Sequence, residues 1–224
     1  MNIGILGSGI VAQTLGAHLS RAGHSVLLGT RTPDDLDTKR GMGATLEKWL
    51  DAAAPHGSVA TFRDCAAQGE VLVNATSGTG SLAALRLAGE DELAGKILLD
   101  VANPLDFSRG MPPTLTICNT SSLGEQIQEA FPATKVVKTL NTMNAQIMVD
   151  PASVGGGDHH VFVSGNDADA KRTVTAYLQD WFGWREVIDL GGIETARGAE
   201  MILPIWLNLW GSIGSPRFNF KVVR

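Results

Sequence analysis

The first twelve residues constrain the fold of this chain more than any other stretch. Residues 2–6 form an apolar run of strand length, and residues 7–12 follow directly with the sequence G-S-G-I-V-A. A helical pattern then opens, in which Val11, Leu15 and Leu19 recur at intervals of four residues. A strand, a glycine turn and a helix in this order are typical of the G-x-G-x-x-G/A dinucleotide-binding motif. An ordinary glycine turn is the alternative, and it requires neither the strand nor the helix.

Each small residue of this turn has its own physical role. Gly7 allows the tight turn that leads out of the strand, and Gly9 lacks a Cβ, so a pyrophosphate can approach the backbone closely. Ala12 replaces the third glycine and is still small enough for the helix to lie close to the sheet. The free N–H groups at the start of the helix then face the phosphates. We therefore expect a dinucleotide to contact Gly7, Ser8, Gly9, Ile10 and Val11.

The tip of the second predicted strand, residues 25–29, indicates which dinucleotide fits. NAD is usually recognised by an Asp or Glu about 20 residues after the glycines, which binds the ribose 2′-hydroxyl. This chain instead has Thr30 and Arg31, whose hydroxyl and guanidinium groups can both bind a phosphate. The tip therefore favours NADP(H) over NAD(H). Asp34 and Asp35 lie close by in the sequence and would repel a 2′-phosphate unless they point away.

Strand and helix patterns alternate along most of the remaining chain, which predicts an α/β fold. We expect further strands at residues 58–62, 71–75, 96–101, 135–140, 160–164 and 185–190. A helix should start near Thr32, be interrupted at Gly41 and Gly43, and continue from Leu46 to Pro55. Further helices should start near Ser122 and Asp167, and a last apolar helix over residues 193–213 should be buried here or against another subunit. The expected fold is a Rossmann-type, doubly wound, mostly parallel sheet with a small, mainly helical C-terminal part. A composition shift near residue 150 separates an NADP-binding domain, residues 1–150, from a small domain, residues 151–224, for the acceptor pocket and dimer contact.

Three loops after predicted strands are further candidates for ligand contacts. Ligands of open parallel sheets bind at the carboxyl ends of the strands, and plain turn chemistry is the alternative for the first two loops. The expected cofactor contacts in these two loops are Thr76, Ser77, Ala102, Asn103 and Pro104. The third loop contains Asn141, Thr142 and Met143, the candidate catalytic residues, which we expect to hold the nicotinamide and the face of the acceptor.

The composition of the 224 residues excludes several other classes of function. The net charge is -5 without a basic block, so nucleic acid and anionic membranes are poor candidates as partners. The N-terminus does not resemble a signal peptide, and the apolar tract of residues 201–213 is too short for a membrane span. Cys65 and Cys118 are expected as free thiols in a reducing cytoplasm. His159 and His160 would point to opposite faces of a strand, so we expect no metal site.

Several of these stretches resemble the NADPH-dependent reductases of coenzyme F420, an 8-hydroxy-5-deazaflavin. The resemblance extends over nearly the whole chain and rests on residues 5–9, 29–31, 122–140, 161–167 and 200–211. The Ser-Arg pair with which that family binds the 2′-phosphate is matched by Thr30 and Arg31. Residues 100–104 and 140–142 are instead similar to the cytosolic oxidoreductase domain of the six-transmembrane metalloreductases, which uses NADPH and a flavin.

The resemblance implies a homodimer and direct hydride transfer between stacked rings, with coenzyme F420 or FMN/FAD as the acceptor of an NADP(H)-dependent oxidoreductase. The protein then supplies positioning and a water-poor cleft, and the transfer step needs no side-chain acid. The chain departs from archaeal members at Asn141, where they carry a His, and at Asp34 and Asp35, where they carry basic residues. Two alternatives stay open: a reductase of a small imine or ketone, which needs a proton donor, and a non-catalytic NADP(H)-binding protein.

Overall fold

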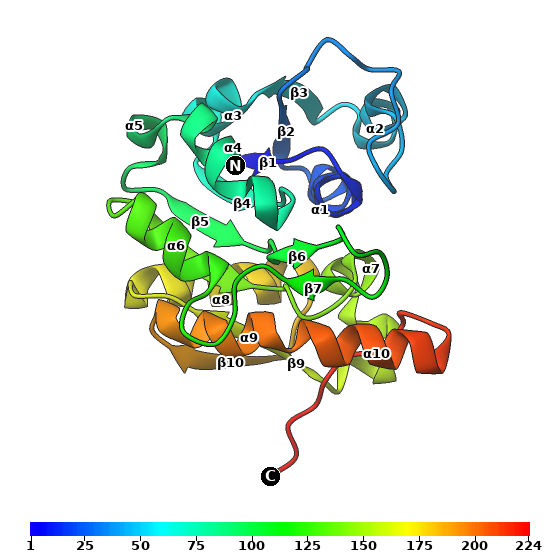
Figure 1. The fold of residues 1–224 in the computed structure, drawn as a ribbon. Coiled ribbons are helices and arrows are strands. Elements are labelled where there is room, and N and C mark those ends of the chain that lie inside the picture. Colours follow the sequence, from blue (N-terminus) through cyan, green and yellow to red (C-terminus); the bar gives the residue numbers. More distant parts are fainter.

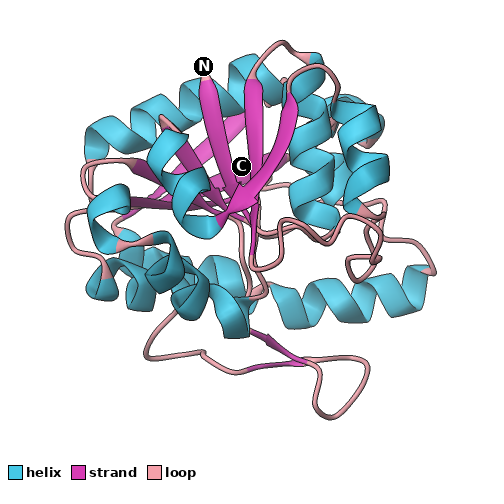
Figure 2. Cartoon of the chain, turned by 90° about the horizontal axis from the view of Figure 1, so that it is seen from above, coloured by secondary structure: helices cyan, strands magenta, loops and turns pink.

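The computed structural model describes all 224 residues, which form one large sheet with helices on both faces (Figure 1, Figure 2). The strands of this sheet are β1 Asn2–Leu6, β2 Ser25–Thr30, β3 Gly57–Thr61, β4 Val71–Asn74, β5 Ile97–Asp100, β8 Lys135–Thr139, β9 His160–Ser164 and β10 Glu186–Gly191. They lie in the order β10-β9-β8-β5-β4-β1-β2-β3. Neighbouring strands pair in parallel except β8 and β9, which are antiparallel. This arrangement confirms the predicted doubly wound, mostly parallel α/β fold.

The helices cover the two faces of the sheet. Their bounds are α1 Ile10–Arg21, α2 Leu46–Ala53, α3 Phe62–Gln68, α4 Ser81–Ala88, α5 Glu90–Leu93, α6 Leu123–Ala130, α7 Ala145–Val149, α8 Ala168–Phe182, α9 Ala196–Met201 and α10 Leu203–Ile213. Side chains of α1, α2, α7 and α8 form a first apolar core with the strands, and those of α3 to α6 and α9 form a second core on the opposite face. A sheet covered on both faces needs apolar residues on both, and β4 provides Val71 and Val73 for the first core and Leu72 for the second.

The predicted strands are all present, and their ends differ from the prediction by no more than one residue. A short hairpin of β6, Leu105–Asp106, and β7, Thr114–Leu115, follows β5 as a separate two-stranded sheet. Four short 3-10 turns complete the fold, namely η1 Gly78–Gly80, η2 Pro151–Ser153, η3 Gly155–Gly157 and η4 Ile193–Thr195. The predicted start of a helix at Ser122 is confirmed, because its hydroxyl accepts a hydrogen bond from the backbone N–H of Glu125.

The first part of the helix predicted to start near Thr32 does not form, whereas its predicted continuation from Leu46 is present as α2. Residues 31–45 are a loop, and α2 begins at Leu46 after its N-cap residue Thr45. The carboxylate of Asp35 accepts a hydrogen bond from the backbone N–H of Thr38, which stabilises a local turn in place of a helix. Later in the loop the backbone is left-handed at a glycine, and this conformation also opposes a continuous helix.

The predicted helix over residues 193–213 is interrupted. η4 and α9 form its first part, and α10 starts at Leu203 with Pro204 in its first turn, a position where the missing N–H is tolerated. Figure 1 shows α9 and α10 following one another along the lower side of the molecule. Trp206 is buried, but Ile205 is 51% and Ile213 57% exposed, so the chain itself covers only one side of α10.

The sheet and the first core both run across residue 150. β9 pairs with β8, and Val161, Val174 and Trp184 belong to the same apolar core as Ile3 and Ile5. The division of the chain into two domains at residue 150 stays a prediction. None of the helices combines the length and the apolar character that crossing a bilayer requires.

Candidate functional site

Six parallel strands end at the same edge of the sheet, and the loops that follow the five of them from β2 to β8 meet there. The last register positions run across the strands as Gly29, Leu6, Asn74, Asp100 and Lys138. The outer loops are defined here as the segments at the tips of β1 and β2, residues 7–12 and 30–45. The inner loops are those after β4, β5 and β8, residues 75–77, 101–104 and 140–143. All the predicted site residues lie in these two sets.

The glycine turn of the outer loops has the geometry that a dinucleotide needs. Gly7 has a φ of 126°, and a Cβ there would lie 2.5 Å from the carbonyl oxygen of Ala75, so only glycine fits. A Cβ on Gly9 would meet no atom within 4 Å, which leaves the backbone open on that side. No side chain caps the first turn of α1. The N–H groups around Ser8, Ile10 and Val11 can therefore receive a pyrophosphate, and these residues fit a dinucleotide.

Thr30 and Arg31 lie together at the tip of β2, as predicted. Thr30 is buried, and its hydroxyl accepts a hydrogen bond from the backbone N–H of Thr32. The side chain of Arg31 is exposed and makes no hydrogen bond or ion pair within the chain, so its guanidinium is available to an anion. Asp34 is also exposed to solvent.

Arg40 supplies a second guanidinium to the outer loops, which sequence reasoning missed. It donates hydrogen bonds to the hydroxyl and the carbonyl of Thr32, and its Nη2 lies 3.3 Å from Oδ2 of Asp35. A hydrogen bond from Thr38 holds the pKa of Asp35 below its ordinary value. The carboxylate of Asp35 is thus paired with Arg40, which reduces the repulsion that it would exert on a phosphate near Arg31.

Gln13, on α1, joins the two outer loops. Its Nε2 donates to the carbonyl oxygens of Ser8 at 3.0 Å and Ala44 at 2.9 Å, and its Oε1 accepts from the N–H of Ala44 at 2.8 Å. The side chain is buried, so these bonds are protected from water. Gln13 therefore fixes the glycine turn against the loop that carries Arg40. No local motif marks a Gln at this position, which explains why the sequence did not reveal it.

Two of the predicted residues in the inner loops, Asn103 and Asn141, bind each other. Asn103 Nδ2 donates to the carbonyl of Asn141 at 2.8 Å, and Asn141 Nδ2 donates to Oδ1 of Asn103 at 3.0 Å and to the carbonyl of Ala199 on α9 at 3.2 Å. Thr142 and Met143 are buried beside them, and Met143 belongs to the first core. The side-chain donors of Asn141 are thus already used to position the loops.

The other predicted contacts of the inner loops surround this pair. Thr76 is half-buried and donates a hydrogen bond from its hydroxyl to Oδ1 of Asn74. Ser77 is exposed just before η1. Ala102 and Pro104 are buried, and their carbonyl oxygens accept hydrogen bonds from other parts of the chain. The second and third inner loops are thus bonded directly to each other, and the first is connected to them through Asn74 and Asp100.

A buried ionic cluster lies directly behind the inner loops. Nζ of Lys138 lies 2.6 Å from Oδ2 of Asp100 and 2.9 Å from Oε1 of Glu200, and all three side chains are at most 1% exposed. Burial lowers the pKa of Lys138, but the two carboxylates together raise it by more, so the pKa lies above its ordinary value. Sequence reasoning missed the cluster. The signals were Asp100 at the end of an otherwise apolar strand and Lys138 directly after two valines.

The backbone is strained where the third inner loop begins. Leu140 has a φ of 59° and is buried, although left-handed backbone is uncommon for residues other than glycine. Such a conformation costs about 1–3 kcal/mol and persists only where the surrounding contacts fix it. Strained residues of this kind cluster at functional sites, and Leu140 directly precedes the candidate catalytic residue Asn141.

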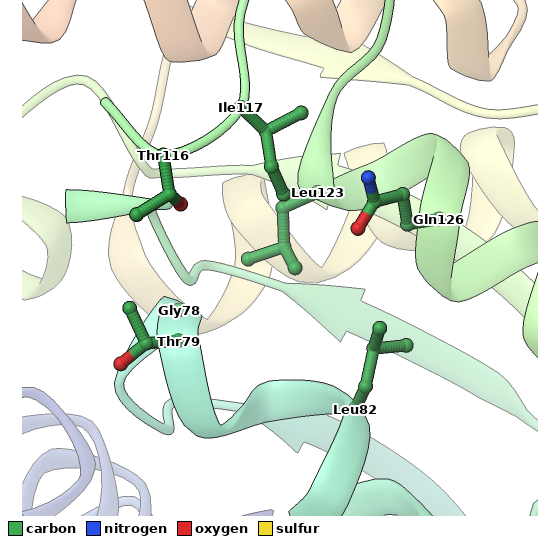
Figure 3. A pocket seen from close by; sticks show the side chains of 7 residues that line it. All are labelled: Gly78, Thr79, Leu82, Thr116, Ile117, Leu123 and Gln126. Carbon is green, nitrogen blue, oxygen red and sulfur yellow. The ribbon is translucent and has the colours of Figure 1, made fainter. Parts of the chain in front are cut away.

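A cavity of about 250 Å³ lies between η1, the β7 segment and α6 (Figure 3). It is lined by Gly78, Thr79, Leu82, Thr116, Ile117, Leu123 and Gln126. The cavity adjoins the inner loops at Gly78, where a Cβ would lie 2.0 Å from the carbonyl oxygen of Asn103. None of the predicted site residues lines it, so the cavity is separate from the predicted cofactor contacts.

Histidine and cysteine side chains lie outside both sets of loops. The structure gathers no group of three or more His, Cys, Asp or Glu side chains that could hold a metal ion. His159 is buried, and its ring nitrogens are bonded to the carbonyl of Pro151 and the side-chain amide of Asn219. Burial raises the pKa of the Cys65 thiol to about 12, so this thiol stays protonated, whereas Cys118 is exposed.

Known proteins resemble this chain over part or all of its length. A family model described as NADP oxidoreductase, coenzyme F420-dependent, matches residues 2–104. Metalloreductase STEAP3 from Rattus norvegicus is 32% identical over 209 residues, which are 91% of this chain and 37% of that protein. The F420-dependent NADP reductase of Methanocaldococcus jannaschii is 29% identical over 148 residues, 66% of this chain and 65% of that protein. The chain thus spans only part of the length of each of these two relatives.

Solved structures extend the comparison to the whole chain. An imine reductase from Myxococcus stipitatus, in complex with NADP⁺, shares the fold with a TM-score of 0.66 at 15% identity, over 96% of this chain and 63% of that chain. A crystal structure of a proposed F420-dependent NADP reductase from Arthrobacter sp. FB24 is 56% identical, with a TM-score of 0.94 and complete coverage of both chains. Together with the family-model match, this similarity shows that the chain belongs to the family of coenzyme F420-dependent NADP oxidoreductases.

Proposed function

We propose that this chain is an NADP(H)-dependent oxidoreductase that transfers a hydride between NADPH and a deazaflavin of the coenzyme F420 type. The observation that carries the proposal is the form of the outer loops, an open glycine turn with the unpaired guanidinium of Arg31 beside it. The chain that carries these loops is 56% identical throughout to the proposed F420-dependent NADP reductase from Arthrobacter.

The two sets of loops have different roles in this proposal. Backbone N–H groups near Gly9 bind the pyrophosphate, while Thr30 and Arg31 bind the 2′-phosphate. NADPH, when bound, supplies the hydride from its nicotinamide ring. Asn103 and Asn141 hold the inner loops in one geometry, so that the ring is presented to the acceptor in a fixed orientation.

The inner loops favour a ring acceptor over an imine or a ketone. Residues 75–77, 101–104 and 140–143 contain no ionisable side chain. The charged groups nearest along the strands, Asp100 and Lys138, are already paired with each other. Reduction of an imine or a ketone needs a proton donor, whereas hydride transfer between two rings needs no side-chain acid in that step. A flavin is the second candidate acceptor, because the resemblance to the six-transmembrane metalloreductases implies it and the rat metalloreductase is similar to 91% of this chain.

Oxidation of NADPH by the purified protein tests the proposal. The absorbance of the reduced nicotinamide is followed with coenzyme F420, FMN, FAD, a ferric chelate and a cyclic imine, each added in turn. Rapid oxidation with coenzyme F420 alone is the expected result. Turnover with a flavin or iron alone would instead assign the chain to metalloreductase-like chemistry. Tight binding of NADPH without turnover on any acceptor would contradict the proposed reaction and favour a binding protein.

We also propose that the active form is a homodimer in the cytoplasm. The side of α10 that the chain leaves uncovered carries Ile205 and Ile213, and Met201 nearby is 41% exposed. A second copy of this chain is the partner that the family resemblance implies for this side. Both cysteines are free thiols, which fits a reducing compartment. Light scattering after size-exclusion chromatography should show a dimer for the wild type and a monomer for Ile205→Asp, and a monomeric wild type would contradict the proposal.

A further inference from the structure

The second face of the sheet is apolar except in its last row. On β4, β5 and β8 an apolar residue faces this core, namely Leu72, Leu98 and Val136. Two residues further along each strand, the buried side chain is polar or charged, namely Asn74, Asp100 and Lys138. Asp100 is the direct register partner of both Asn74 and Lys138. These three adjacent residues, at most 1% exposed, are termed the polar row. The row lies one residue before the inner loop on β4 and β5 and two residues before it on β8.

Each member of the polar row also binds an inner loop. Asn74 Oδ1 accepts a hydrogen bond from the hydroxyl of Thr76 at 2.7 Å, and its Nδ2 donates to Oδ1 of Asp100 at 2.9 Å. The same Oδ1 of Asp100 accepts from the N–H of Ala102 at 3.2 Å, and Nζ of Lys138 donates to the carbonyl of Ala102 at 2.7 Å. The conformations of the first two inner loops therefore depend directly on the position of the row.

Glu200 on α9 connects the polar row to the C-terminal part of the chain. Its Oε1 lies 2.9 Å from Nζ of Lys138 and accepts from the N–H of Gly124 at 3.0 Å. Its Oε2 accepts from the N–H of Leu123 at 2.8 Å, so this one carboxylate also caps the start of α6. All the hydrogen-bonding atoms of the carboxylate and of the ammonium group are engaged. These directed contacts restrict how α9 and α6 can lie against the polar row.

We infer that Lys138 is a positioning residue, which acts through Asp100 and Glu200 to set the inner loops against α9. The inference rests on the proposed NADP(H) site. Buried ion pairs contribute little net stability compared with well-packed apolar residues, so stability alone does not explain three buried charged groups at this place. The row is hydrogen-bonded to the first two inner loops, whereas no side chain of the row is hydrogen-bonded to the outer loops, the proposed site of the adenosine end. Loss of the polar row should therefore affect the orientation of the nicotinamide ring more than the binding of the phosphates at the adenosine end.

Two variants of nearly unchanged shape and one matched control test this inference in the full chain. Glu200→Gln and Asp100→Asn each weaken the ion pairs of Lys138. The control, Arg197→Gln, removes the ion pair between Arg197 on α9 and Glu125 on α6, which joins the same two helices without touching the row. For each protein we would measure the Kd of NADPH, the Kd of adenosine 2′,5′-bisphosphate, the melting temperature and the single-turnover rate of NADPH oxidation.

The bisphosphate contains only the adenosine end, so the ratio of the Kd of NADPH to that of the bisphosphate reports on the nicotinamide end alone. We expect Glu200→Gln and Asp100→Asn to raise this ratio about fivefold and to slow single turnover about tenfold. Arg197→Gln should lower the melting temperature but leave the ratio and the rate within about twofold of the wild type.

The ratio also separates this inference from the proposed reaction. Variants that melt cooperatively and keep the wild-type ratio and rate would show that the polar row is only structural, and would overturn the inference. Equal losses in Arg197→Gln would overturn it too, because they would follow from a loosened α9 rather than from the row. If the wild type binds NADPH but none of the acceptors oxidises it, the proposed reaction is contradicted. The ratio of the two Kd values still decides the role of Lys138 in that case.

Discussion

The outer and inner loops lie at the same edge of the sheet but differ in how their polar groups are used. In the outer loops the guanidinium of Arg31 is free, Gly9 faces open space and the first turn of α1 is uncapped. In the inner loops Asn103 and Asn141 are bonded to each other. Free groups can form new bonds with a ligand and so determine affinity, whereas groups that are already paired determine geometry. The difference teaches that affinity and turnover should respond to separate sets of substitutions.

Substitution of Gly9 should have the largest effect on affinity. A side chain at this position meets no protein atom within 4 Å, so Gly9→Val should fold with an unchanged melting temperature. The new side chain would occupy the space through which the pyrophosphate approaches the backbone, and NADPH should bind about 100-fold more weakly, a loss of about 2.7 kcal/mol. Fluorescence titration with NADPH measures the effect. Unchanged affinity would show that the dinucleotide does not cross this turn.

Removal of the free guanidinium should change which dinucleotide is preferred. Hydrogen bonds to charged groups contribute about 1.5–3 kcal/mol, so Arg31→Gln should weaken NADPH binding about 10- to 100-fold. The affinity for NADH, which lacks the 2′-phosphate, should change little. Titration of both cofactors against the wild type and the variant makes the comparison. An equal loss for NADPH and NADH would place Arg31 away from the 2′-phosphate.

A substitution in the inner loops should affect turnover more than affinity. Asn141→Ala removes the donors to Asn103 and Ala199, so kcat should fall about tenfold while the Kd of NADPH stays within about threefold. Asn166→Ala is a matched control, because Asn166 bonds the N–H of Ile193 and lies outside both sets of loops. Steady-state kinetics with titration of NADPH measures both quantities. If Asn141→Ala and Thr142→Ala leave both unchanged, these residues have no part in the site.

The smallest expected effect is a pH dependence of stability at the junction of α6 and α9. A hydrogen bond from Arg197 holds the pKa of Glu125 below its ordinary value of 4.5. The stabilisation by this pair is therefore complete above pH 4.5 and is lost as the pH falls through the lower pKa of the folded protein. The difference in melting temperature between the wild type and Arg197→Gln should shrink across that range. A difference that stays constant with pH would show that Glu125 contributes no linked stability.

Features with a local signal were predictable from the sequence. The strand at residues 2–6, the glycine turn and the pair Thr30 and Arg31 all follow one another within a short stretch, and the structure places them together. The N-cap at Ser122 was equally local. The prediction of a helix start at Thr32 was wrong because a hydrogen bond between Asp35 and Thr38 stabilises a turn there. The periodicity of apolar residues does not reveal such a turn.

The inner loops could be located but not their contacts. The pairing of Asn103 with Asn141 spans 38 residues, and that of Lys138 with Glu200 depends on where α9 lies against the sheet. Such contacts are set by strand register and helix docking rather than by neighbours in the sequence. Arg40 escaped notice for a related reason, since its partners depend on the path of an irregular loop.

The sheet that continues past residue 150 has a consequence for how the chain folds. Val161, Val174 and Trp184 cover the same core as Ile3 and Ile5, so a fragment that ends at residue 150 would expose that core and leave β8 as an unprotected edge strand. We therefore expect that a fragment of residues 1–150 would not fold stably when it is excised or joined to another protein. Heat should unfold the dinucleotide half and the C-terminal part in one cooperative transition.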